Sequence, residues 1–208
     1  MFDKFLSIDQ EKQQRVINAS LKVFALKGYE AASTNEIARE AGISKGLLFH
    51  YFTSKKDLYL YLYDYAVDLI TEKVNEFVDP RERDFFERLK QITNVKMAIY
   101  DQFPDLLTFQ KTIYFEESAE VSSELKARSK LIAENAYHKL FSDIDTSKFK
   151  EGVDVKRAMN VILWSLEGLA DSERERHKAL GIDLDIPHLL EEYERYVQLF
   201  KTSFYKQS

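Results

Sequence analysis

Residues that interrupt helices are scarce in this sequence. Its 208 residues include only six glycines and three prolines, the two residue types that cost the most free energy inside a helix. Apolar side chains recur every three and four positions along nearly the whole chain, which is the spacing of a buried helix face. No segment keeps the alternation of apolar and polar residues typical of a half-buried strand. The sequence therefore predicts an all-α fold of about nine helices.

Start and stop signals divide this pattern into individual helices. The first helix is expected over residues 10–27, with Gly28 just after its end, where a left-handed backbone favours glycine. Asp185 and Pro187 mark the start of the last helix. Two short helices follow the first, and the others are expected over residues 54–78, 85–100, 106–114, 121–141, 155–179 and 188–206.

The sequence contains no cysteine. This excludes a disulfide framework, a thiolate metal site and a cysteine nucleophile, and it is consistent with a reducing compartment. The N-terminal segment lacks the apolar core of a signal peptide, and no run of about 18 apolar residues occurs. We therefore expect a cytoplasmic protein with no membrane partner.

The formal net charge of −5 conceals an uneven distribution. Residues 1–60 contain nine Lys and Arg against seven Asp and Glu, whereas residues 61–208 contain 21 against 28. Only the N-terminal part can therefore approach nucleic-acid phosphates without net repulsion. Many helical proteins vary this much, so the asymmetry has meaning only together with a DNA-binding motif.

Residues 33–59 contain three helix starts close together. Ser33 and Glu36 have the spacing of a capping box, in which each side chain binds a free backbone amide of the first turn. Gly42 permits the positive φ of a tight turn, and Ser44 caps the helix that follows. Two short helices joined by a glycine turn predict a helix-turn-helix over about residues 33–53.

The second helix of such a unit enters the major groove of DNA, with its N-terminal residues toward the base edges. Leu48 and Phe52, four positions apart, would hold this helix on the core. Gly46 costs about 1 kcal/mol relative to alanine inside a helix, which is explained by close approach of its backbone to DNA or, alternatively, by close packing within the protein. The side chains left to face DNA or its margin are Lys45, Leu47, Phe49, His50 and Tyr51.

Polar groups near this helix suit phosphate contacts. His50 can donate to a phosphate, and Tyr51 can hydrogen-bond through its hydroxyl while its ring packs. Ser54 and Asp57 begin the next helix with a further capping pair. Lys55, in the first turn of that helix, would add a positive charge to the helix end.

The segment FALKGYEAASTNEIAREAGISKGLLFHYFTSKKDLY resembles the DNA-binding domain of the TetR family of regulators, and the match runs from about Gln10 to Tyr65. The resemblance implies a three-helix DNA-binding domain, a divergent C-terminal ligand domain, and a homodimer that usually represses transcription until an inducer binds. The residues that fall in register are Phe24, Gly28, Tyr29, Ile37, Ala38, Ala41, Gly42, Ser44, Lys45, Gly46, Tyr51, Phe52, Lys55 and Leu58.

The expected DNA-binding residues combine this resemblance with the reading of the helix-turn-helix. Two of them depart from the family pattern, since Leu47 stands where the family often has threonine and Phe49 where it often has tyrosine. A polar base contact and a phosphate hydrogen bond are then missing, and apolar contact with a thymine methyl is expected instead. The full set is Ser33, Thr34, Ser44, Lys45, Gly46, Leu47, Phe49, His50, Tyr51 and Lys55.

Residues 1–60 are thus expected to form the DNA-binding domain, and residues 61–208 the effector-binding and dimerisation domain. Aromatic and sulfur-containing side chains recur in the second domain and would line an apolar cavity for a small, largely hydrophobic effector. The alternative is that they simply fill the core. The expected pocket residues are Met97, Phe103, Phe109, Tyr137, Trp164 and Glu167.

The last two helices carry apolar stripes that suit a dimer interface. Paired across a two-fold axis, such stripes form a four-helix bundle, and Gly168 and Ala170 would allow close approach of the helices. The alternative is an intramolecular core. The expected interface residues are Met159, Ile162, Leu163, Leu166, Leu189, Tyr193, Val197 and Phe200.

Catalytic motifs are missing from the sequence. The four histidines are scattered, and no zinc-protease, nucleophile-elbow, phosphate-loop or dinucleotide fingerprint occurs. We therefore expect no enzyme, no metal site and no cofactor. The predicted function is a sequence-specific, DNA-binding transcriptional regulator, a repressor released from double-stranded operator DNA by its effector. The alternative is a helical carrier of lipids or small hydrophobic molecules without a DNA role.

Overall fold

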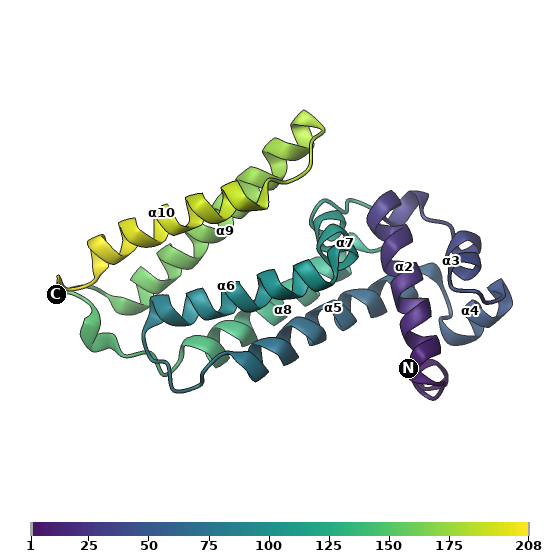
Figure 1. Ribbon diagram of the computed structural model, residues 1–208, viewed down its shortest axis with the longest axis horizontal. Helices are drawn as coiled ribbons and strands as arrows, with labels where there is room; N and C mark the ends of the chain where they lie inside the picture. Colours follow the sequence, from purple (N-terminus) through teal and green to yellow (C-terminus); the bar gives the residue numbers. More distant parts are fainter. Residues whose placement is uncertain (1, 208) are drawn as a thin grey trace. The chain divides into compact units, whose positions relative to one another are not determined.

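The computed structural model describes residues 2–207, except for the side chains of residues 133, 134, 137 and 138. Over this range the chain is built from helices and contains no β-strand, which confirms the all-α prediction. The elements are α1 (Asp3–Leu6), α2 (Gln10–Ala31), α3 (Thr34–Glu40), α4 (Lys45–Tyr51), α5 (Lys55–Phe77), α6 (Phe85–Gln102), α7 (Pro104–Tyr114), α8 (Ser122–Phe141), the short 3-10 helix η1 (Thr146–Lys148), α9 (Val155–Leu180) and α10 (Ile186–Phe204) (Figure 1).

The nine predicted helices are all present, and α1 and η1 are additional. Gly28 has φ 69° and interrupts the helical conformation within α2, so the regular part of this helix ends where the sequence predicted. Asp185 accepts a hydrogen bond from the His188 amide at 3.0 Å and caps α10, with Pro187 in the first turn. Local sequence signals therefore set these boundaries correctly.

The chain divides into two compact units. The first runs to Val78 and includes Gln91–Leu140, and the second consists of Asp79–Lys90 and the chain from Phe141 onward. This division describes packing rather than function, and a functional boundary near residue 60 remains a prediction.

Helix α7 packs along α2 in the first unit (Figure 1). The rings of Phe24 from α2, Tyr59 from α5 and Phe109 from α7 meet at this contact, with centroid distances of 4.8 Å from Phe24 to Tyr59 and 5.2 Å from Tyr59 to Phe109. All three rings are fully buried. Such edge-to-face clusters add to the stabilisation from apolar burial. The helix-turn-helix is therefore built on the same core as α7.

Polar contacts join α5 to α8 in the same unit. The Tyr63 hydroxyl and Ser129 Oγ are 2.8 Å apart, and Arg128 forms an ion pair with Asp64. These contacts hold the two long helices side by side (Figure 1).

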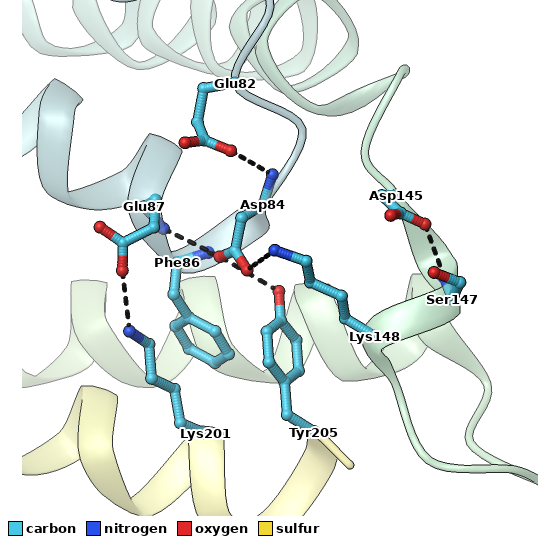
Figure 2. Close-up of polar contacts among 9 residues, drawn as sticks. All are labelled: Glu82, Asp84, Phe86, Glu87, Asp145, Ser147, Lys148, Lys201 and Tyr205. Carbon is cyan, nitrogen blue, oxygen red and sulfur yellow. Dashed lines mark hydrogen bonds and ion pairs between the residues drawn. The ribbon is translucent and has the colours of Figure 1, made fainter. Parts of the chain in front are cut away.

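The second unit contains a polar cluster around Asp84, a buried carboxylate directly before α6 (Figure 2). One of its oxygens accepts hydrogen bonds from the amides of Phe86 at 2.9 Å and Glu87 at 3.1 Å, and so caps α6. The other accepts from Lys148 Nζ at 2.7 Å, and the Tyr205 hydroxyl lies 3.4 Å from the first. The cluster joins the start of α6, η1 and the C-terminal segment.

Burial alone would raise the pKa of Asp84, but the Lys148 ammonium and the Glu87 and Phe86 amides outweigh it. The pKa of this carboxyl therefore lies below its ordinary value, and the group is charged at neutral pH.

Within residues 2–207, no helix combines the length and the apolar character needed to cross a membrane.

Candidate nucleic-acid interface

The start of α3 differs from the predicted capping box. Ser33 has an extended backbone at the N-cap position, but its side chain makes no capping hydrogen bond. Glu36 instead accepts a hydrogen bond from Lys27 Nζ at 2.5 Å, an ion pair to the preceding helix. The prediction of a reciprocal box was therefore wrong, because a partner from another helix engages the carboxylate. Ser33 is exposed and Thr34 is half-buried.

The turn after α3 has the conformation that the sequence predicted. Gly42 has φ 67°, a region that disfavours residues with a Cβ. The Ile43 amide donates to the Ala38 carbonyl at 2.9 Å, and the Gly42 amide to the Arg39 carbonyl at 3.1 Å. These two bonds form a Schellman motif, which ends a helix and reverses the chain. The glycine therefore fixes the geometry of the helix-turn-helix.

Helix α4 begins immediately after this turn and is held to the core by one face. Ser44 Oγ accepts a hydrogen bond from the Leu47 amide at 3.1 Å, which confirms the predicted cap. Leu48 and Tyr51 are buried, as is Phe52 directly after the helix. The opposite face is exposed to solvent, and it carries Lys45, Gly46, Phe49 and His50.

The exposed face of α4 is open around Gly46. Among the described residues, a Cβ added there would meet only Ser44 Oγ, at 4.0 Å. Close packing within the described part of the chain therefore does not explain this glycine. Lys45 Nζ lies 5.8 Å above the ring of Phe49, which is 38% exposed, and Leu47 is half-buried beside them. This face offers one ammonium group, apolar surface and a stretch of accessible backbone.

Lys55 is engaged within the protein. Its Nζ donates to the carbonyl oxygens of Tyr29 at 2.9 Å, Glu30 at 3.3 Å and Ala32 at 3.4 Å. The same ammonium lies 4.4 Å above the Tyr29 ring. It therefore satisfies carbonyl groups at the end of α2, a place where cations are favourable. A contact of Lys55 with DNA, expected from the sequence, remains a prediction.

Lys12 was not singled out in the sequence, yet it lies next to α4. Its Nζ is 5.9 Å from the ring centroid of Tyr51. Nothing in the local sequence distinguishes Lys12 from an ordinary surface lysine, because its proximity to Tyr51 arises only from the folded domain. To identify Lys12 from the sequence, one would need to know which helix faces pack together in the whole domain.

Hydrogen bonds tie the end of α2 to the segment after α7. The Tyr29 amide donates to Glu116 Oε2 at 3.1 Å, and Ser118 Oγ forms a short hydrogen bond with Glu30. Tyr29 and Tyr59 lie in the core beside these contacts, and burial raises the pKa of both phenols. Both rings are therefore neutral at physiological pH. The helix-turn-helix is linked to α7 by packing and by polar contacts.

The residues expected to line an effector pocket have very different surroundings. Trp164 is 66% exposed and Glu167 is also exposed, so neither lines an enclosed cavity within the chain. Phe109 belongs to the packed core between α2, α5 and α7. Met97 and Phe103 are half-buried. The side chain of Tyr137 lies outside the described residues.

A small cavity lies between α6 and α10 in the second unit. It has a volume of about 50 Å³, and Phe86, Val197, Glu87 and Lys201 are among the residues that line it. This volume suits one or two water molecules. It is too small for a hydrophobic effector.

Four residues expected at a dimer interface are interior residues instead. The exposed fractions are 5% for Met159, 0% for Ile162, 8% for Leu166 and 6% for Val197. Because the chain already buries them, they have no surface to offer a second copy, and the intramolecular alternative is correct for these four. The remaining members, which are partly exposed, are Leu163, Leu189, Tyr193 and Phe200.

Other apolar side chains of α9 and α10 are exposed. Val161 and Trp164 lie three positions apart on α9, and Tyr196 and Leu199 lie three positions apart on α10, so each pair shares a helix face. Their exposed fractions are 43%, 66%, 37% and 57%. Gly168 follows Trp164 by four positions, and no atom of the described residues lies within 4 Å of a Cβ built there. We call these four side chains the apolar face of the second unit.

Two seven-residue helices joined by a glycine turn, with the second helix exposed along one side, define a helix-turn-helix protein of the DNA-binding class. Residues 16–62 match the family described as bacterial regulatory proteins, tetR family. This match covers α3 and α4 together with most of α2 and the first turns of α5.

Relatives extend the likeness beyond this domain. The fatty acid metabolism regulator protein of Bacillus subtilis is 26% identical over 166 residues, which cover 75% of this chain and 80% of the relative. The HTH-type transcriptional activator FasR of Mycolicibacterium smegmatis is 28% identical over 169 residues, or 80% and 72% of the two chains. A crystal structure of the transcriptional regulator FadR from Bacillus subtilis in complex with stearoyl-CoA has the same fold, with a TM-score of 0.63, 19% identity and coverage of 91% and 97%.

Residues 16–62 therefore form a DNA-binding domain of the tetR family, and the relatives support a TetR family transcriptional regulator for the chain as a whole. The relatives named above are transcriptional regulators rather than enzymes.

Proposed function

We propose that this regulator is a repressor that binds a palindromic operator through α4 and leaves it when a long-chain acyl thioester binds. The observation that carries the DNA-binding part is the exposed face of α4, with Lys45, Gly46, Phe49 and His50 on the side opposite its buried residues. A short helix held by one face can enter the major groove with the other.

The proposed contacts follow from the chemistry of this face. Lys45 is positioned for a phosphate or a guanine edge, and Leu47 and Phe49 for thymine methyl groups. The open space at Gly46 allows the backbone to approach DNA closely. Lys12, beside Tyr51, adds a phosphate contact from α2. Ser33, Thr34 and Ser44, on or next to the helix-turn-helix turns, remain proposed contacts at its margin.

Dimerisation is proposed through the apolar face of the second unit. The exposed Trp164 and its neighbours would pack against their copies across a two-fold axis, because a solvated tryptophan of this size is costly. Open space above Gly168 would let the two α9 helices approach closely. A dimer would present two α4 helices about 34–36 Å apart, one turn of DNA.

The DNA-binding part is tested by selecting duplexes from a random-sequence pool with the purified protein. We expect a palindromic sequence to be enriched, and a gel shift to give an affinity for it at least about a thousandfold above that for a random duplex of the same length. Enrichment of no sequence, together with weak and sequence-independent binding, would contradict the proposal and favour the carrier alternative.

The acyl thioester is proposed because a relative is named for fatty acid metabolism and a structure of the same fold holds stearoyl-CoA. Coupling to DNA is proposed to pass through α7. This helix packs on α2, and its following segment binds the end of α2 through Glu116 and Ser118. A ligand that shifts α7 would therefore move the helix-turn-helix.

The effector is tested by titrating stearoyl-CoA against the complex of the protein with its selected operator. Nearly complete release requires the ligand to prefer the free protein by roughly 10⁴-fold. Coenzyme A alone should have no effect, because the acyl chain supplies the apolar contact. Unchanged operator affinity with acyl chains of every length would contradict this effector class.

The sign of regulation needs a separate experiment, because FasR is named as an activator. A promoter containing the selected operator and fused to a reporter should become more active when the gene for this protein is deleted. Lower reporter activity after deletion would show activation and contradict the repressor part of the proposal alone.

A further inference from the structure

We infer that α1 is a positioning element for α4, so that the first residues of the chain set how the DNA-contacting helix is held. Five aromatic rings form a cluster here, which we call the aromatic brace. It consists of Phe2 and Phe5 around α1, Tyr51 and Phe52 at the end of α4, and Tyr61 on α5.

Phe5 is the centre of the aromatic brace. Its exposed fraction is 0%. Its ring centroid lies 4.8 Å from that of Phe52, 5.4 Å from Tyr61 and 5.6 Å from Tyr51. Phe2 adds contacts of 5.5 Å to Phe52 and 5.0 Å to Tyr61. Phe5 on α1 thus contacts Tyr51, the last residue of α4, and Phe52, which directly follows it.

The segment that carries these rings is fixed by hydrogen bonds. Gln13 Nε2 donates to the Leu6 carbonyl at 3.2 Å and to the Ile8 carbonyl at 2.8 Å. Asp9 caps α2 by accepting from the Lys12 amide at 2.8 Å. These hydrogen bonds fix the backbone between α1 and α2, and this holds Phe5 in place against α4.

Helix α4 needs such support because it is short. It has seven residues, of which only Leu48 and Tyr51 are buried, and a helix of this length is not stable alone. Helix α3 contacts α4 as well, but the last turn of α4 and Phe52 are held by the brace. Phe49 and His50, which face solvent, immediately precede that end. A change at Phe5 would therefore tilt the residues proposed to contact DNA.

This inference rests on the proposed contact between α4 and DNA, and it differs from a purely stabilising role of α1. Base-specific contacts depend on the pose of α4, whereas nonspecific binding depends mainly on phosphate charges. A positioning role therefore predicts a loss of specific affinity without a matching loss of nonspecific affinity. A stabilising role predicts that both fall together as the protein unfolds.

The test compares Phe5→Ala with Phe5→Leu and with Leu6→Ala in the full chain. Leu6 lies in the same helix but is 55% exposed and outside the brace, which makes it the matched control. The probes are the duplex selected by the wild-type protein and a random duplex of the same length. Hydrogen exchange is measured at the amides of α4 and, for comparison, of α3.

For Phe5→Ala we expect about a tenfold or greater loss of affinity for the selected duplex, the size expected from losing a base contact, and a change within about twofold for the random duplex. Amides of Leu48 and Phe52 should exchange faster, and those of Ile37 and Ala38 should not. Phe5→Leu should recover most of the specific affinity because it refills the site. Leu6→Ala should match the wild type.

Equal binding of the selected duplex by Phe5→Ala and the wild type would overturn the inference. Parallel loss of both affinities together with faster exchange throughout α3 and α4 would also overturn it, because α1 would then act on stability alone. If Phe5→Ala does not fold, Phe2→Ala, which truncates a partly buried ring of the same brace, gives the same comparison. If the wild type selects no sequence, the proposed function fails first.

Discussion

Gly46 is the residue at which local stability and the proposed function conflict. Its backbone is helical, and a Cβ would meet nothing closer than Ser44 Oγ at 4.0 Å. Gly46→Ala should therefore raise the free energy of unfolding by up to about 1 kcal/mol, and it should weaken operator binding because the methyl group would stand between the backbone and DNA. Chemical denaturation and gel shifts measure the two effects. A higher free energy of unfolding with unchanged operator affinity would refute close approach of the Gly46 backbone to DNA.

Lys12 and Lys55 should respond differently to the same substitution. Lys12→Ala should weaken binding to every duplex alike and reduce the dependence of log affinity on log salt by about one. Lys55→Ala should leave that salt dependence unchanged and lower the free energy of unfolding by about 1–3 kcal/mol, because carbonyls at the end of α2 lose their donor. The reverse pattern would restore Lys55 as a phosphate contact and remove Lys12.

For single residues, sequence signals predicted the caps and turns that depend on residues nearby in the chain. The caps at Ser44 and Ser54 and the turn at Gly42 depend on backbone groups within five positions, so their spacing is sufficient. The Ser33 capping box failed because Lys27, nine positions before Glu36, binds the carboxylate instead. The hydrogen-bond partners of Lys55 could not be predicted for the same reason, since they lie 23 to 26 positions away.

Among the elements, the long helices were predictable and α1 was not. In helices such as α5 and α9 the apolar stripe repeats over many turns, so its periodicity is easily detected in the sequence. Four residues in α1 span about one turn and show no repeat. Its position depends on rings from α4 and α5, which are distant in sequence. The aromatic brace could therefore not be inferred from local pattern.

Periodicity also leaves open which partner covers an apolar stripe. On α9 the stripe of Met159, Ile162 and Leu166 was recognised correctly as apolar, but it is buried inside the chain. The exposed pair, Val161 and Trp164, lies on another face of the same helix. Only the packing of α9 against α10 distinguishes the two faces.

A charge placed on the exposed face should separate the two copies of the proposed dimer. Trp164→Glu should increase the dimer dissociation constant by about a hundredfold or more, because a buried tryptophan is a common hot spot and an unpaired carboxylate is costly there. Leu131→Glu on α8, where the leucine is 60% exposed, is the matched control and should leave it unchanged. Analytical ultracentrifugation measures both. An unaltered dimer in Trp164→Glu would exclude this face.

Over the whole molecule, the cluster around Asp84 should make stability depend on acid pH. Its folded pKa is depressed, so its contribution is complete above the unfolded value of about 3.9 and is lost as pH falls through the folded pKa. Asp84→Asn should lower the free energy of unfolding by about 1–3 kcal/mol at pH 7. This deficit should shrink below about pH 4, because the wild type then loses the same charge.

Urea denaturation at a series of pH values measures this difference. A matched control is Asp145→Asn, at a carboxylate that caps the exposed η1 and lies outside the Asp84 hydrogen bonds. A deficit of Asp84→Asn that stays constant from pH 7 to about pH 3 would contradict the assignment of this charge as the cause.

Trp164 is the single tryptophan of the sequence, and it lies on the exposed apolar face of α9. Indole fluorescence from this protein therefore has one source, located where two copies are proposed to meet. Emission should move to longer wavelength on dilution, as water replaces the partner around the ring. The native chain would in this way report its own state of association in solution, without an added label.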